Sequence, residues 1–326
     1  MGLELLLQEV LRLFGLQLCG AVPTCNVKGT VNLTFTVETD RGWKVVQRLA
    51  PMFDEQLVAQ GLKVHYWLRG RNVMTPEYCL TRDGRVAIRH GEDVWRVCEY
   101  IAHDPTASKS PARIIAAAHT LGKFHTAMVG YPHAPVCALP HFHDSRYYFQ
   151  ELMRVLKSNA GRAIPEVLDL GMSVIEQGLR CLGAIPASQI VIHGDPKFDN
   201  FLFAGNAVAA IVDLDTVMMG NELLDLGDAL RSWCRTSDNA FKADLFQAAY
   251  ASYCQEHHVP YAEEQVLQAV ELITLELLSR YLVDAVDQSY FRWNEAEFPS
   301  LQEQNLHNAR QLYAYYRSIA DCCVSV

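Results

Sequence analysis

The sequence lacks several features that would assign it at once to a special class of protein. It has no apolar run long enough to cross a membrane, no low-complexity tract and no internal repeat. Its ten cysteines include no Cys-x-x-Cys pair, and its formal net charge is −9, so it has no excess of positive charge. These absences, with the ordinary composition, indicate a protein that is neither disordered nor membrane-spanning. They also argue against a general surface for nucleic acid or anionic lipid.

The opening segment, 2–18, is the stretch most easily mistaken for a targeting signal. Charged side chains interrupt it, no basic region precedes it, and no small-residue cleavage site follows it. We therefore expect an amphipathic helix there, and a cytoplasmic protein whose cysteines stay reduced. The 326 residues, 50% apolar and 20% charged, suit an ordinary globular protein with one large domain or two lobes. The sequence gives no indication of the oligomeric state.

Short alternating apolar runs fill the first hundred residues, and helical periodicity fills the rest. Strands are predicted at 22–28, 31–38, 43–49, 75–80, 85–88 and 94–98, with one helix over 54–69. Further helices are predicted at 111–128, 145–158, 165–183, 222–233, 239–257, 262–286 and 302–319. The expected fold is of the α+β class. A small lobe with an antiparallel sheet, 1–98, is joined by a hinge to a larger, mostly helical lobe, 99–326.

Polar side chains suited to phosphoryl transfer gather near residue 200. The stretch 191–203 has the pattern of a buried strand, a tight polar loop and a second strand, and the next strand ends at Asp213. A hairpin would bring Asp195, Asn200 and Asp213 to one rim. Asp195 can accept the proton of an attacking hydroxyl, while Asn200 and Asp213 can hold Mg²⁺. Lys197 can offset the charge of the transferring phosphoryl group. A polar loop with capping aspartates is the alternative.

Two earlier features have the form of a nucleotide site. Gly29 stands in a turn between two strands, where backbone N–H groups can lie over a phosphate, and a plain hairpin turn is the alternative. The strand over 43–49 carries Gln47 and Arg48, and one of the two would face the α- and β-phosphates. Successive side chains of a strand point to opposite faces, but the pattern leaves open which of the two points inward.

The segment 193–200, His-Gly-Asp-Pro-Lys-Phe-Asp-Asn, resembles the catalytic loop of the aminoglycoside-phosphotransferase and small-molecule kinase superfamily, distant relatives of protein kinases. The segment 211–213 resembles its metal-binding strand end. The resemblance implies a bilobal protein-kinase-like fold with ATP and Mg²⁺ as cofactors. It implies that Asp195 is the base, that Asn200 and Asp213 are the metal ligands, and that Lys197 touches the γ-phosphate.

The same resemblance assigns two further elements. It implies that the run 97–101, which includes Glu99 and Ile101, is the hinge that binds adenine. It also implies that Asp225, at the start of a helix, hydrogen-bonds the catalytic loop. Both residues of the hinge are therefore candidates for cofactor binding, and Asp225 is expected to have a supporting role.

A narrower resemblance, to N-acetylhexosamine 1-kinases and their relatives, covers segments spread over most of the chain: 139–145, 213–218, 226–231, 280–284, 290–291, 305–306 and 309–311. In that branch, residues at the positions of Arg280 and Tyr290 help to hold the sugar. A histidine after the loop glycine and an asparagine in the first-lobe helix also bind sugar there. Thr30 and Gln60 occupy these positions in this chain, Thr30 beside Gly29 in the expected cofactor loop and Gln60 as a candidate for the substrate.

The expected function is transfer of the ATP γ-phosphate to a hydroxyl group of a small molecule. A sugar or amino sugar is the first candidate acceptor, which would place the enzyme in carbohydrate metabolism. The first alternative is a kinase of another alcohol, such as homoserine, choline or an aminoglycoside. The second is a non-catalytic nucleotide-binding regulatory protein, which the intact Asp195, Asn200 and Asp213 argue against. No nucleic-acid or membrane partner is expected.

Overall fold

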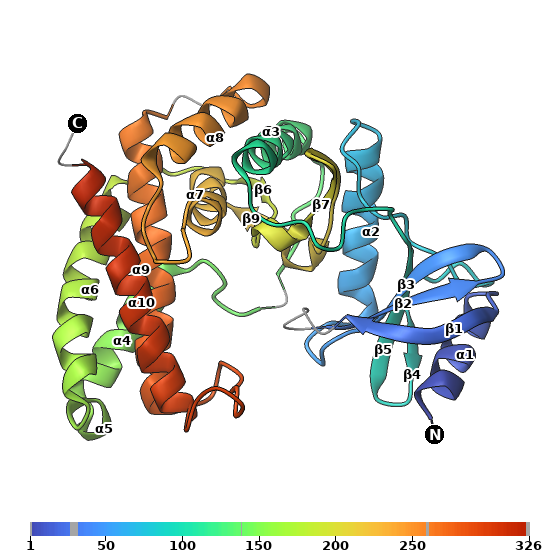
Figure 1. Cartoon of the computed structure of the whole chain (residues 1–326), viewed down its shortest axis with the longest axis horizontal. Helices are drawn as coiled ribbons and strands as arrows, with labels where there is room; N and C mark the ends of the chain where they lie inside the picture. The colour runs from blue at the N-terminus through green and yellow to red at the C-terminus, as the bar shows by residue number, and fades with distance from the viewer. Residues whose placement is uncertain (1, 27–31, 138, 259–260, 324–326) are drawn as a thin grey trace. The chain divides into compact units, whose positions relative to one another are not determined.

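Figure 1 shows a computed structural model of the chain, in which residues 2–26, 32–137, 139–258 and 261–323 are described. The chain forms two compact units, each assembled from several segments and each described here by itself. The first comprises Met1–Ser108, Thr126–Pro140 and Asp199–Met219, and the second Lys109–His125, His141–Phe198 and Gly220–Val326. The predicted division into lobes 1–98 and 99–326 stays a prediction. None of the described helices is both long and apolar enough to span a membrane.

A five-stranded sheet organises the first unit. Its neighbour order is β1-β2-β3-β5-β4, and each neighbouring pair is antiparallel, as predicted. The strands are β1 (Leu18–Asn26), β2 (Leu33–Thr39), β3 (Gly42–Arg48), β4 (Ile88–His90) and β5 (Asp93–Glu99). Because alternate side chains point to opposite faces, the sheet can bury apolar residues on both sides.

Helices α1 (Leu3–Leu13) and α2 (Glu55–Arg69) pack on opposite faces of this sheet. Val97 of β5 belongs to the apolar cluster that contains α1, whereas its neighbour Cys98 belongs to the cluster that contains α2. The α1 cluster is completed by residues that are almost fully buried, among them Leu7, Val10, Leu11, Phe35, Val46 and Trp95. The face on which a side chain of β3 or β5 lies can therefore be read from these two clusters.

Short local signals set the ends of these helices. Asp54 accepts hydrogen bonds from the backbone N–H groups of Gln56 and Leu57, at 3.0 and 2.9 Å, which confirms the predicted start of α2. The prediction for the first helix was too long. It ends at Leu13 because Gly15 has a φ of +70°, a left-handed conformation that terminates helices.

Two of the predicted strands differ from the observed ones. The strand predicted over 75–80 is wrong, since this segment contributes only an isolated bridge, Tyr78 opposite Cys98. Pro76 has no N–H to donate to a ladder, which shortens the pairing. The strand predicted over 85–88 lies instead at β4, where Ile88 pairs with Trp95 of β5.

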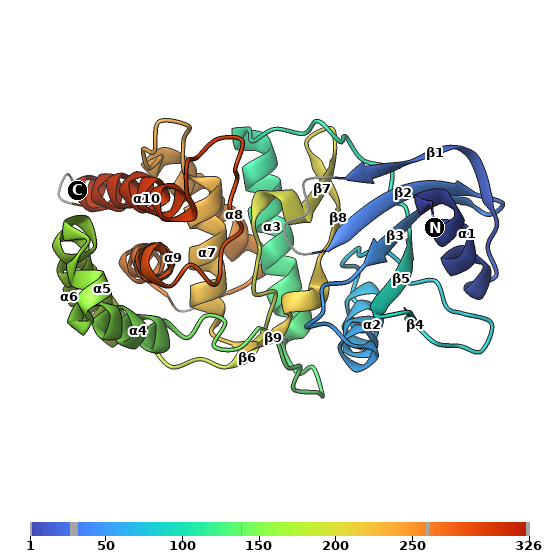
Figure 2. The ribbon, with the colours of Figure 1, turned by 90° about the horizontal axis from the view of Figure 1, so that it is seen from below.

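Helices make up most of the second unit. Its elements are α3 (Pro111–Met128, whose last turn belongs to the first unit), α4 (Ser145–Lys157), α5 (Asn159–Arg162), α6 (Pro165–Ala184), β6 (Ile190–Ile192), α7 (Glu222–Trp233), α8 (Ala243–Glu256), α9 (Glu263–Asp287) and α10 (Leu301–Cys323). Helix α9 packs against α4, α6, α7 and α10, so it is the centre of this unit (Figure 2). The helices predicted from the periodicity are confirmed, with ends that shift by a few residues.

Gly227 lets α7 approach α9 closely, and an alanine there should destabilise the fold. A Cβ atom at Gly227 would lie 2.8 Å from the backbone carbon and 2.9 Å from the backbone oxygen of Ala269. Overpacking of this kind costs about 1–3 kcal/mol, so we expect Gly227→Ala to lower the melting temperature. Gly183→Ala is the control, because nothing lies within 4 Å of its Cβ position. Equal melting temperatures for the two variants would contradict the close packing of α7 on α9.

Candidate functional site

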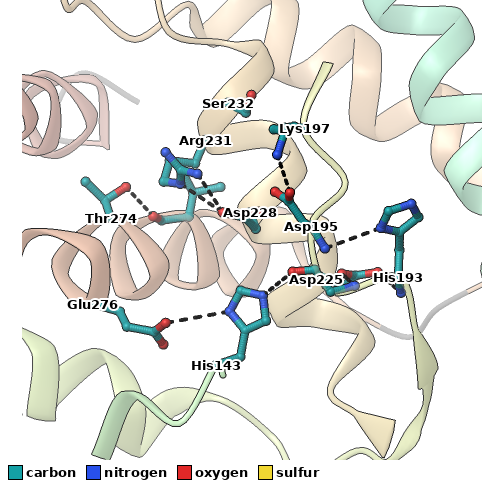
Figure 3. A network of polar contacts seen from close by, with 12 residues as sticks. His143, His193, Asp195, Lys197, Asp225, Asp228, Arg231, Ser232, Thr274 and Glu276 are labelled. Atoms are coloured by element: carbon teal, nitrogen blue, oxygen red, sulfur yellow. Dashed lines mark hydrogen bonds and ion pairs between the residues drawn. The ribbon is translucent and has the colours of Figure 1, made fainter. Parts of the chain in front are cut away.

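The loop that follows β6 in the second unit carries Asp195 and Lys197 (Figure 3). Gly194 has a φ of +85°, a left-handed conformation that costs glycine little. The Asp195 carboxylate forms an ion pair with the Lys197 ammonium group, and their side chains are 25% and 35% exposed. The loop therefore presents a solvent-accessible carboxylate whose charge is balanced by a cation from the same loop.

Asp225, in the first turn of α7, fixes the backbone of this loop. Its carboxylate oxygens accept hydrogen bonds from the N–H groups of His193 and Gly194, at 2.9 and 2.8 Å. His125 donates to the same carboxylate at 2.9 Å and is itself bonded to the Tyr253 hydroxyl at 2.7 Å. Burial raises the pKa of Asp225, but the hydrogen bond from His125 and the nearby histidines outweigh burial and lower it. The expectation that Asp225 hydrogen-bonds the loop is confirmed.

His143 holds the same loop from the other side, a role that the sequence alone did not reveal. This largely buried side chain, which is 8% exposed, donates from Nε2 to the carbonyl oxygen of Gly194 at 2.6 Å. Its Nδ1 lies 3.6 Å from Glu276, a charge pair too long for a hydrogen bond (Figure 3). Burial lowers the pKa of His143, but Glu276, Asp228 and the Gly194 carbonyl outweigh burial and raise it to about 9. An imidazolium therefore holds the peptide that precedes Asp195.

The hairpin of the first unit brings Asn200 and Asp213 together. Strands β7 (Phe201–Ala204) and β8 (Ala207–Ile211) are antiparallel, with Phe201 opposite Ile211. Just beyond that pair, the Val212 N–H donates to the Asn200 carbonyl at 2.9 Å. Asp213, the next residue, has φ +64° and ψ +54°, a left-handed conformation uncommon for a residue other than glycine. Asp195 belongs to the second unit, so its link to this pair is the five-residue spacing in the chain.

The donor chemistry of this hairpin fits a magnesium ion. Asn200 is buried, and its amide oxygen and the carboxylate of Asp213 are the hard oxygen donors that Mg²⁺ prefers. The described residues hold no group of three or more His, Cys, Asp or Glu side chains that could bind a metal by themselves. A site with two protein ligands suits an ion whose other ligands are phosphate oxygens and water.

Gln47 and Arg48 point to opposite faces of the sheet. Arg48 pairs with Asp93 at 3.4 Å, and both side chains are 41% exposed. Gln47 lies across from Arg96 in the β3–β5 register and accepts a hydrogen bond from the Arg96 Nε at 2.8 Å. Arg96, which is 3% exposed, was missed as a candidate. A lone charged residue inside the apolar run 94–98 was the available signal.

The structure describes the two hinge candidates, Glu99 and Ile101, but not the two candidates in the expected loop after β1. Glu99 ends β5, and its carboxylate pairs with the buried Lys44 ammonium at 3.0 Å. The Ile101 carbonyl accepts a hydrogen bond from the His103 ring at 2.8 Å. Gly29 and Thr30 lie outside the described residues. The cofactor roles of all four stay predictions.

Of the three substrate candidates, two come together in the second unit. Arg280 donates to the Tyr290 hydroxyl, and its guanidinium carbon lies 4.7 Å from the Tyr290 ring centroid and 5.1 Å from that of Tyr148. Gln60 belongs to the first unit, where its amide makes two hydrogen bonds with the backbone of Val136, at 3.0 and 2.9 Å. It also lines a cavity of about 400 Å³ with Lys63, Tyr131 and His133. These substrate roles also stay predictions.

Residues 26–263, more than half of the chain, match the phosphotransferase enzyme family. The chain belongs to this family. The membership confirms the predicted superfamily and the prediction that the protein is a phosphotransferase acting on a hydroxyl group. A homoserine kinase of Rhodopseudomonas palustris is 33% identical over 81 residues, a match that spans 24% of each protein. Because the match is so short, homoserine kinase activity is only a proposal for this chain.

Solved structures of this superfamily share the fold. A microcompartment-associated aminopropanol kinase has a TM-score of 0.71 at 15% identity, with 98% of each chain covered. An amicoumacin kinase in complex with AMP-PNP and Ca²⁺ has a TM-score of 0.68 at 11% identity, with 98% of this chain and 94% of that chain covered. An aminoglycoside phosphotransferase from Alicyclobacillus acidocaldarius has a TM-score of 0.62 at 16% identity, with 95% of each chain covered. At these identities the likeness shows the fold alone, and it confirms the predicted bilobal, protein-kinase-like α+β class.

The raised pKa of His143 makes the stability of this phosphotransferase depend on pH. Since the pKa rises from 6.5 to about 9 on folding, the stabilisation is complete below pH 6.5 and is lost as the pH rises through about 9. We expect the free energy of unfolding of the wild type to fall by about 3 kcal/mol between pH 6.5 and about 9, relative to His143→Asn, whose side chain cannot titrate. Chemical denaturation at a series of pH values measures this difference. His141→Asn is the control: that residue has the same φ of 57°, but its side chain is half-exposed. Parallel curves for wild type and His143→Asn would contradict the assignment.

Proposed function

We propose that the protein is a kinase that transfers the γ-phosphoryl group of ATP to a hydroxyl group of a small molecule, with Mg²⁺. The observation that carries this proposal is the clamped loop around Asp195. Asp225 accepts hydrogen bonds from two N–H groups of this loop, and His143 donates to the carbonyl of Gly194. The backbone that carries the Asp195 carboxylate is therefore held in place. A base must be positioned before it can act, and such positioning supplies much of the rate of phosphoryl transfer.

In this mechanism, each side chain has one task. The acceptor oxygen bonds to the γ-phosphorus, the bond from that phosphorus to the β–γ bridging oxygen breaks, and ADP leaves. Asp195 orients the acceptor hydroxyl and receives its proton. Lys197, beside Asp195, neutralises charge on the transferring group. Asn200 and Asp213 would hold Mg²⁺, which when bound neutralises charge between the β- and γ-phosphates.

For the acceptor, a sugar or amino sugar of the N-acetylhexosamine type is the first candidate. It is supported by the contact of Arg280 with Tyr290, the two positions that help to hold the sugar in the N-acetylhexosamine kinases. Homoserine is the second candidate, supported by the 81-residue similarity to a homoserine kinase. A cytoplasmic location, ATP in place of GTP and a role in carbohydrate metabolism belong to the same proposal.

Four of the acidic side chains of α9 argue against an acceptor with several positive charges. Each of these four carboxylates is already engaged within the second unit: Glu271, Glu276, Asp284 and Asp287. Glu271 accepts from a cysteine thiol, and Glu276 lies beside a buried histidine and accepts from a serine. Asp284 accepts from three backbone N–H groups and an asparagine, and Asp287 pairs with an arginine. Binding an aminoglycoside through them would break these contacts, so a neutral acceptor is favoured.

Asp195→Asn should keep the fold but lose turnover. The amide occupies the same space and cannot accept a proton, so we expect kcat to fall roughly 10²- to 10⁴-fold while ATP affinity is retained. Steady-state ADP release measures the first quantity and a thermal shift with ATP and Mg²⁺ the second. Asp199→Asn, an exposed aspartate four residues later, is the matched control and should keep wild-type rates. Near-wild-type activity in Asp195→Asn would refute its role as the base.

A screen of acceptor-dependent ADP release tests the substrate class. The panel contains N-acetylhexosamines, neutral sugars, homoserine, choline and aminoglycosides. We expect the largest kcat/KM for an acceptor that carries no net positive charge, because these four acids of α9 are already paired. A highest kcat/KM for an aminoglycoside would contradict that expectation. ATP binding without ADP release for any acceptor would favour the regulatory alternative.

A further inference from the structure

A buried ion pair lies close to the proposed metal ligands in the first unit. The two Nη atoms of Arg96 donate to the two carboxylate oxygens of Asp215, in a bidentate contact that includes an Nη2–Oδ2 distance of 2.8 Å. The side chains are 4% and 7% exposed. These residues are far apart in sequence: Arg96 lies in β5, and Asp215 lies in η2 (Leu214–Thr216), a single turn of 3₁₀ helix.

The sheet holds Asp215 through further side chains. Asn32 donates to Asp215 Oδ2 at 3.0 Å, and the Asn32 carbonyl oxygen Oδ1 accepts from the Ala50 N–H at 2.9 Å. On the other side, Arg96 Nε donates to Gln47, which fixes the guanidinium on β3 as well as on its own strand. The carboxylate of Asp215 thus accepts charge-assisted hydrogen bonds from two residues, Arg96 in β5 and Asn32 just before β2, and Gln47 in β3 holds Arg96 in turn.

Asp213, the proposed metal ligand, lies two residues before Asp215 and has a left-handed backbone. Such a conformation persists in a residue other than glycine only where its surroundings hold it. Both flanks of Asp213 are anchored. On one side Val212 donates its N–H to the Asn200 carbonyl at 2.9 Å, and on the other Leu214 is buried and Asp215 is paired.

We propose that Arg96 and Asp215 are positioning residues for Asp213. The pair ties η2 to the sheet, and the tie keeps the Asp213 carboxylate in the orientation that binds the divalent cation. The proposal rests on the proposed function, in which Asn200 and Asp213 hold that cation. It assigns Arg96, a residue of the five-stranded sheet, a task that neither Gln47 nor Arg48 performs. The pair acts through the metal ligand and makes no contact of its own with the metal.

The test removes both charges of the pair at once. A single substitution would leave one buried charge unpaired and could unfold the protein, whereas Arg96→Gln/Asp215→Asn leaves two neutral groups that can still hydrogen-bond. Mn²⁺ binding in the presence of AMP-PNP is followed by electron paramagnetic resonance, and the melting temperature is recorded beside it. The dissociation constant for Mn²⁺ should rise roughly 10- to 100-fold in a variant that stays folded, the usual effect of losing a partner of a metal ligand.

A second bidentate pair provides the matched control. Arg310 donates to Glu166 through Nε and Nη2, both at 2.7 Å, but this pair is partly exposed and belongs to the second unit. Arg310→Gln/Glu166→Gln should keep the wild-type affinity for Mn²⁺. Asp213→Asn is the reference for loss of the metal ligand itself.

Four outcomes decide whether the pair positions Asp213 and whether Asp213 binds the metal. Weak Mn²⁺ binding in both Arg96→Gln/Asp215→Asn and Asp213→Asn supports positioning. Weak binding in Asp213→Asn alone overturns the inference and leaves the proposed metal ligand intact. Unchanged Mn²⁺ binding in Asp213→Asn overturns the metal assignment itself. If Arg96→Gln/Asp215→Asn loses affinity for AMP-PNP without metal, the pair acts on the nucleotide, and the positioning role is also overturned.

Discussion

The loop that carries Asp195 depends on one contact: two consecutive backbone N–H groups of the loop donate hydrogen bonds to the buried carboxylate of Asp225. They hold His193 and Gly194, the residues directly before the proposed base. A buried carboxylate is stable only if it is well paired, and here a histidine provides the third hydrogen bond. His143 completes the arrangement through the Gly194 carbonyl. The position of Asp195 therefore follows from the packing of α7 and from the polar network beneath it.

A comparable constraint operates in the first unit, where a hairpin and a buried ion pair surround Asp213. The hairpin sets the separation of Asn200 and Asp213, because Phe201 and Ile211 are paired strand residues. The ion pair of Arg96 with Asp215 fixes the turn that follows. In each unit, a residue proposed to act in the reaction, Asp195 or Asp213, is held in place by neighbouring side chains that do not themselves react. Such neighbours contribute through geometry, which is why their loss is expected to change binding constants as well as stability.

The sequence predicted what depends on local pattern and missed what depends on distant contacts. The spacing from Asp195 to Asn200 and the hairpin that follows are local, and the observed hairpin agrees with the pattern. The partners of Arg96 and His143 lie 119 and 51 residues away, so no window of sequence could pair them. The contact of Gln47 with Arg96 needed the register of β3 with β5, and which of Gln47 and Arg48 faces the phosphates stays a prediction. The strand predicted over 75–80 failed because alternation alone does not reveal the ladder donor that Pro76 lacks.

The family fixes the reaction class, while the role of Arg280 and Tyr290 in choosing the acceptor stays a proposal. In the proposed reaction, one loop supplies the base and one hairpin supplies the metal ligands of a phosphoryl transfer. A crystal structure with AMP-PNP and Mn²⁺ tests it most directly, because anomalous scattering locates the metal. We predict a manganese peak bound by Asn200 and Asp213, with the γ-phosphate facing Asp195. A peak on other side chains, or a γ-phosphate remote from Asp195, would contradict it.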